Sequence, residues 1–89
     1  MTNKQKINAL YWMFGYICVN DKYISMCESF DLYLIENKIE CEGSFTETIP
    51  EILEFKPENP NTYWFDFNDF GKQFRLFAIR KTIKKIQTD

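Results

Sequence analysis

The sequence predicts a mainly α-helical fold, a compact domain of three to four helices with a short extended aromatic segment before the last helix. Apolar residues recur at helical spacing in several separate segments. A helix-capping pattern precedes one of these segments, and the aromatic run at 63–67 has no convincing partner strand. Because 89 residues are too few to build two cores, we expect residues 1–89 to form a single domain.

The first helix is predicted over residues 4–19. One face carries apolar residues at 3-4-3 spacing, and the opposite side is apolar as well. A helix that is apolar all round must be covered on both sides, so we expect it to be central or shared between two protomers. The first face holds Ile7, Leu10, Phe14 and Ile17, and the opposite side holds Ala9, Trp12, Met13, Tyr16 and Val19.

Two more helices are predicted in the middle of the chain. Ser25 and Glu28 fit a capping box that starts a helix over 26–38, and Pro50 suits the first turn of a short helix at 49–55. The inward face of the former holds Met26, Cys27, Phe30, Tyr33 and Leu34; that of the latter holds Ile49, Ile52, Leu53 and Phe55.

The last helix is predicted over residues 69–87, and together with the first it should form the centre of the domain. Its core stripe is Leu76, Ile79, Ile83 and Ile86. The opposite face runs from aromatic to basic, with Phe70, Phe74 and Phe77 followed by Arg80, Lys81, Lys84 and Lys85.

Charge is sorted along the chain. Residues 28–69 contain eleven carboxylates against Lys38 and Lys56, whereas the last twenty residues contain six basic side chains against Asp89. The acidic middle could therefore meet a cationic surface, such as a groove that normally holds nucleic acid. Alternatively, the basic helix packs against the acidic middle, within one chain or across a dimer.

Catalysis is not expected from this composition. The chain has no histidine and no motif for a nucleophile, a phosphate loop or a zinc protease, so we predict no enzyme activity and no cofactor. Cys18, Cys27 and Cys41 lack metal-site spacing, so we expect reduced, buried structural thiols and no metal. The apolar run 9–19 is too short to span a bilayer, and the chain is expected to be cytoplasmic with no membrane partner.

Binding is the function that remains. We expect contact with a partner protein through acidic residues, with two aromatic residues as anchors. A nucleotide sponge or nucleic-acid binding on the last helix is the alternative, which the low pI of about 5.1 opposes. The partner-binding candidates are Glu40, Glu42, Glu47, Glu51, Glu54, Tyr63, Trp64 and Asp66, and those of the alternative are Arg80, Lys81, Lys84 and Lys85.

The C-terminal quarter resembles small accessory proteins encoded by bacteriophages. The resemblance rests on Tyr63-Trp64-Phe65, Gly71-Lys72-Gln73, Arg75 and the amphipathic terminal helix. It implies a product that acts in the cytosol of an infected bacterium and inhibits a host or defence protein. The implied partner is a bacterial protein or protein–nucleic acid complex, and a homo-oligomer is possible.

Overall fold

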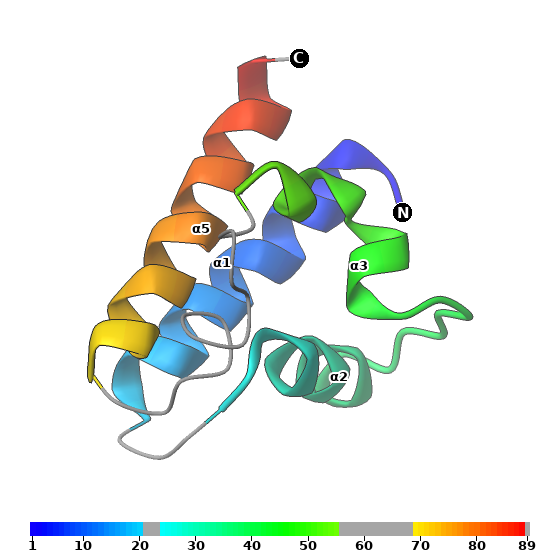
Figure 1. Cartoon of the computed structure of the whole chain (residues 1–89). Coiled ribbons are helices and arrows are strands. Elements are labelled where there is room, and N and C mark those ends of the chain that lie inside the picture. The colour runs from blue at the N-terminus through cyan, green and yellow to red at the C-terminus, as the bar shows by residue number, and fades with distance from the viewer. Residues whose placement is uncertain (21–23, 56–68, 89) are drawn as a thin grey trace.

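The computed structural model describes residues 1–20, 24–55 and 69–88, and it confirms the mainly α-helical prediction. No strand occurs within these three ranges. The elements in chain order are α1 (Asn3–Val19), α2 (Met26–Glu36), α3 (Phe45–Thr48), the 3-10 helix η1 (Pro50–Phe55) and α5 (Asp69–Thr88) (Figure 1). The predicted extended segment at 63–67 lies outside the described residues.

The two long helices, α1 and α5, lie side by side and run in opposite directions (Figure 1). The shorter elements cover one side of this pair: α2 packs on α1, η1 packs on α5, and α3 joins α2 to η1. The first and last helices therefore pack on each other as expected, but they form one of two layers and not a covered centre. The largest fully buried side chains come from all these elements and include Leu10, Met13, Phe30, Phe45 and Ile79.

Helix α1 is buried on two faces but not on all sides. Ala9, Leu10, Met13 and Ile17 are buried. On the remaining side of the helix, however, Tyr11 is 57% exposed and Val19 is 78% exposed. Within one chain this face is therefore uncovered, and cover by a second protomer, the other form of the expectation, stays a prediction.

Helix α2 begins and ends with local hydrogen-bonding motifs. The Ser25 hydroxyl accepts a hydrogen bond from the Glu28 backbone N–H, which confirms the Ser25 half of the predicted capping box. The reciprocal bond to the Glu28 carboxylate is not among the contacts of the described residues. At the other end, Lys38 has a positive φ of 55°, and the N–H of Ile39 bonds the carbonyl of Leu34 at 2.9 Å. The backbone N–H of Lys38 also donates to the carbonyl of Ile35, and these two bonds together make a Schellman motif. Helix α2 therefore ends at Glu36, two residues before the predicted limit.

The segment after α2 contains a short helix that was not predicted. Ser44 and Glu47 form a capping box, which starts α3 and turns Phe45 into the core beside Phe30, with ring centroids 5.4 Å apart. Ile49 and Ile52 are buried as predicted. Leu53 is 45% exposed, because a 3-10 helix has three residues per turn and adjacent residues cannot both face inward.

Helix α5 buries its predicted stripe, since Leu76, Ile79, Ile83 and Ile86 are at most 7% exposed. One basic residue lies on the buried side as well: Arg75 is 2% exposed. The positive charge available at the surface of α5 is therefore smaller than the sequence suggests.

The prediction of buried cysteines is wrong. Cys18 and Cys27 are exposed, and Cys41 is half-buried with its Sγ 3.2 Å from the Thr48 hydroxyl. Cys27 was predicted to lie on the buried face of α2, but it is exposed, and Ser29 of the same helix is buried. The Ser29 hydroxyl donates a hydrogen bond to the Met26 carbonyl. All three thiols are unpaired, as expected. No helix in the described ranges has the length and apolar character needed to cross a membrane.

Candidate interaction surfaces

Charge is separated between the two layers of the fold. Helix α1 contains no acidic residue, and Asp69 is the single acidic residue of α5. The α2–η1 layer contains one basic residue, Lys38. Its acidic residues are Glu28, Asp31, Glu36, Glu40, Glu42, Glu47, Glu51 and Glu54. The linear separation of charge seen in the sequence therefore becomes a separation in space.

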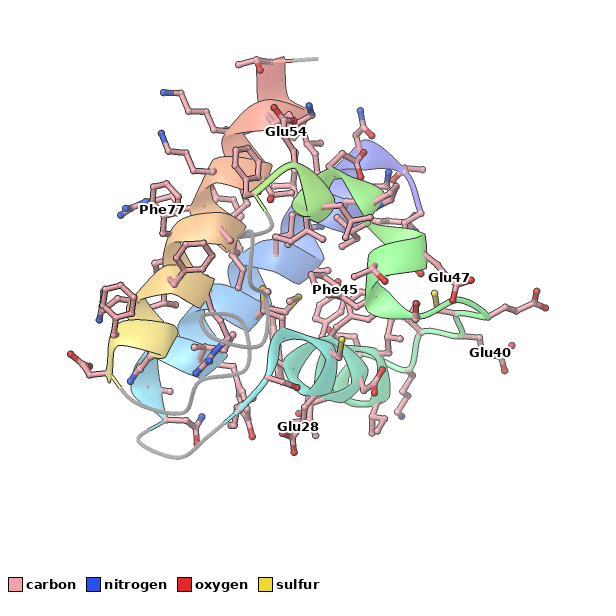
Figure 2. All side chains as sticks on the ribbon, in the orientation of Figure 1. Glu28, Glu40, Phe45, Glu47, Glu54 and Phe77 are labelled. Carbon is pink, nitrogen blue, oxygen red and sulfur yellow. The ribbon has the colours of Figure 1, made fainter. Side chains whose placement is uncertain are left out.

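Six of these carboxylates form what we call the acidic surface: Glu28, Asp31, Glu36, Glu40, Glu42 and Glu47. All six residues are exposed. Figure 2 shows Glu28, Glu40 and Glu47 on the outer side of the α2–α3 layer, away from Phe77 on α5. Neither of the two ion pairs found in the described ranges involves a member of this set. Their charge therefore faces solvent.

The two remaining predicted acidic residues serve a different purpose, because both bind cations of the α1–α5 layer. Glu51 pairs with Lys6 of α1, and Glu54 pairs with Lys85 of α5. Burial raises the pKa of Glu51, but hydrogen bonds from Lys6 and the backbone, and the charges of Lys6 and Lys85, lower it to a net value below 4.5. The alternative in which the basic helix packs against the acidic middle is therefore correct for this part of the chain.

Of the predicted partner-binding set, Glu40, Glu42 and Glu47 lie together on the acidic surface. Tyr63, Trp64 and Asp66 lie outside the described residues. An apolar side chain that the sequence did not single out as an anchor is Ile35 of α2, which is 72% exposed beside Glu36 and one turn from Asp31. Its position off the apolar stripe of α2 was the available signal.

On the α1–α5 layer, Arg80, Lys81 and Lys84 are exposed, whereas Lys85 is engaged by Glu54. The Lys81 ammonium lies 5.6 Å from the centre of the Phe77 ring, a cation–π distance. The predicted run from aromatic to basic residues is thus present on the outer side of α5, where Phe70 is 62% and Phe77 is 40% exposed.

Two hollows meet at Tyr11, and sequence reasoning found neither. The first, of about 230 Å³, lies between the long helices and is lined by Tyr11, Phe14, Arg80 and Ile83. The second, of about 350 Å³, lies along α1 and is lined by Tyr11, Trp12, Gly15, Tyr16 and Val19. The rings of Trp12 and Tyr16 stack there with centroids 5.0 Å apart. We call the outer side of both helices, with Tyr11, Phe14, Phe77, Arg80, Lys81 and Lys84, the aromatic-basic face.

Within the described ranges, no group of three or more acidic or cysteine side chains is arranged to hold a metal ion. The exposed thiol of Cys27 is not an activated nucleophile, because partial burial and the charge of Asp31 raise its pKa.

Comparison with family models, with curated proteins and with solved structures gives no match. Inference about function therefore starts from the two surfaces themselves.

Proposed function

We propose that this chain is a non-catalytic binding protein that docks through its acidic surface onto a cationic surface of a partner protein. The observation that supports the proposal is the gathering of six exposed carboxylates on the α2–α3 side, outside both ion pairs of the described ranges. Complementary charge of this kind steers association and selects the partner.

Ile35 supplies the apolar contact that such a surface needs. Charged rims contribute more to association rate than to affinity, whereas a desolvated side chain near the centre of an interface contributes binding energy. Ile35 is 72% exposed and shares the outward side of α2 with Glu28 and Asp31. It is our candidate anchor among the described residues.

The finer form of the proposal is inhibition of a bacterial host or defence complex in the bacterial cytosol. It rests on the resemblance to phage accessory proteins and on charge. A cationic groove that holds nucleic acid is the type of surface that a row of carboxylates can occupy, because each carboxylate can stand in for a phosphate.

The experiment compares two variants with equal changes in net charge. In the first, Glu40→Lys and Glu42→Lys reverse two charges on the acidic surface without touching the Ser44–Glu47 capping box. In the control, Asn8→Lys, Gln73→Lys, Gln87→Lys and Thr88→Lys add the same charge at exposed positions of α1 and α5. Each protein is immobilised, incubated with bacterial lysate, and its captured proteins are identified and then purified for kinetic measurements.

We expect the acidic-surface variant to lose the captured partner while the control retains it. The association rate of the purified partner with the unmodified chain should fall as salt is added. Equal capture by all three proteins, or an association rate that does not respond to salt, would contradict the proposal.

A further inference from the structure

We infer that the aromatic-basic face is a binding site for single-stranded nucleic acid. This site lies on the opposite layer from the acidic surface and is independent of the partner proposed above. Three features of the described residues support it: the sign of the charge, the placement of aromatic side chains, and the shape of the surface between the two long helices.

The charge of this layer suits a polyanion. Helix α1 contains no acidic residue and carries an exposed Lys4, whereas its Lys6 is paired with Glu51. No acidic residue follows Asp69 within α5, and Arg80, Lys81 and Lys84 are exposed within five residues of one another. Glu54 of the other layer is paired with Lys85. A phosphate chain passing along α5 therefore meets positive charge.

Aromatic side chains lie among and beside these exposed cations. Phe77 lies under the Lys81 ammonium at 5.6 Å. In the hollow between the helices, Tyr11 and Phe14 lie beside Arg80. Non-specific single-strand binding proteins combine a cationic track for the backbone with aromatic faces on which bases stack.

The shape favours unpaired bases over a duplex. Tyr11 lines both the hollow beside Arg80 and the hollow along α1 at Gly15, where a Cβ atom would meet nothing within 4 Å. Tyr11 is 57% exposed between them, so its ring is open to a flat ligand. Bases in a duplex are already stacked and paired, and they cannot use such a ring. The two hollows thus offer stacking sites that single strands can occupy.

The test uses the whole chain and a fluorescein-labelled oligothymidylate of about 15 nucleotides. Binding is measured by the fluorescence anisotropy of the label. We expect saturable binding that weakens with salt, and weaker binding to a duplex of the same length. Tyr11→Ala should weaken binding about tenfold, because it removes one stacking face, and Tyr11→Phe should restore it. Arg80→Ala with Lys84→Ala should reduce the slope of log affinity against log salt by roughly 0.7 for each phosphate that the variant no longer neutralises.

Lys38→Ala is the matched control, since it removes an exposed cation from the other layer and should leave oligonucleotide binding unchanged. Glu40→Lys with Glu42→Lys should also bind the oligonucleotide, which separates this site from the acidic surface. Circular dichroism of each variant verifies the helical fold.

Four results of the oligonucleotide measurements would overturn the inference. They are absence of binding at low salt, equal affinity for the duplex, displacement of the oligonucleotide by polyglutamate at equal charge, and an unchanged affinity in Tyr11→Ala. Self-association at low salt that Tyr11→Ala abolishes would assign the face to a second copy of the chain and would likewise overturn it.

Discussion

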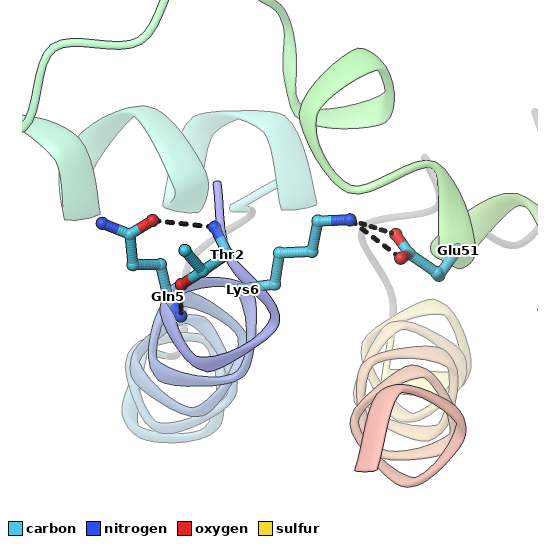
Figure 3. A network of polar contacts seen from close by, with 4 residues as sticks. All are labelled: Thr2, Gln5, Lys6 and Glu51. Carbon is cyan, nitrogen blue, oxygen red and sulfur yellow. Dashed lines mark hydrogen bonds and ion pairs between the residues drawn. The ribbon is translucent and has the colours of Figure 1, made fainter. Parts of the chain in front are cut away.

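The Lys6 ammonium of α1 and the Glu51 carboxylate of η1 are joined by two hydrogen bonds, of 2.8 Å to Oε2 and 3.2 Å to Oε1 (Figure 3). Both side chains are largely shielded, with 14% and 22% of their surface exposed. The helix start that carries Lys6 is held by a capping box, in which Thr2 and Gln5 bond each other's backbone N–H groups. This ion pair connects the basic layer to the acidic layer.

Acid should weaken the fold through Glu51. Its folded pKa lies below the ordinary value of 4.5, so the unfolded chain takes up the proton first. The stabilisation is therefore present above about pH 4.5 and is lost as pH falls through the folded pKa. Urea unfolding of Glu51→Gln should show a loss of about 1 kcal/mol at pH 7 and a smaller difference from the unmodified chain in acid.

The companion measurement is a double-mutant cycle with Lys6→Met, which should give a coupling energy at pH 7 that shrinks in acid. A coupling energy of zero at neutral pH would show that the pair contributes nothing to stability.

Gly15→Ala should stabilise the protein. Gly15 lies in the middle of α1, and a Cβ atom built there meets nothing within 4 Å. Alanine gains about 1 kcal/mol over glycine inside a helix, so the melting temperature should rise by about 4–8 °C. The melting temperature is measured by thermal unfolding monitored with circular dichroism.

Gly43→Ala is the contrasting variant, because its Cβ would lie 3.2 Å from the Thr48 hydroxyl and 3.3 Å from the Glu47 Cβ. Gly43→Ala should therefore not raise the melting temperature. A fall in melting temperature for Gly15→Ala would show that a neighbour closes over this face in solution.

Lys38→Gly should also be stabilising. Lys38 ends α2 with a φ of 55°, a left-handed conformation that costs a residue with a Cβ about 1–2 kcal/mol. Glycine adopts it readily, and part of the gain is offset by its larger entropy in the unfolded chain. Chemical denaturation should therefore show a gain of about 0.5–1 kcal/mol.

Lys38→Ala separates backbone strain from charge. It removes the same positive charge but keeps a Cβ in the left-handed conformation, so it should not reproduce the gain. Equal stabilisation by alanine and glycine would mean that charge, and not φ, is responsible.

The thiol of Cys27 should react slowly for an exposed cysteine. Partial burial raises its pKa, and the carboxylate of Asp31 raises it further, although a backbone hydrogen bond lowers it. In a chain with Cys18→Ser and Cys41→Ser, the rate of reaction with a disulfide reagent at pH 8 should be below that of a small free thiol.

Asp31→Asn should increase this rate, because it removes the negative charge that disfavours the thiolate. The increase should be partial, since burial is the larger cause of the raised pKa. A reaction rate that does not change in Asp31→Asn would show that the carboxylate does not affect the pKa of the thiol.

Much of the helical architecture could be predicted from local patterns. The apolar stripe of α5 and the Ser25 cap of α2 depend on residues within a few positions of one another, and both are confirmed. The short helix α3 was missed although Ser44 and Glu47 form a capping box, because four residues show no apolar period.

The candidate surfaces could be predicted less well. Carboxylates at 40, 42 and 47 are exposed on one side of the fold, and the basic residues at 80, 81 and 84 are exposed on α5. Tyr11 and Phe14, which line a hollow together with Arg80, were not foreseen there, because they come from a helix at the other end of the chain. Spacing along one helix carries no information about such a neighbour.

The sequence by itself determined where helices form and how charge is distributed along the chain, because helical periodicity, capping and charge are local properties. Only the tertiary structure decided which charges are neutralised. Glu51 meets Lys6 across 45 residues and Glu54 meets Lys85 across 31, while Glu40 and Glu47 remain on the surface. The physical reason is that packing α1 against α5 and covering them with η1 brings together side chains that no local pattern relates.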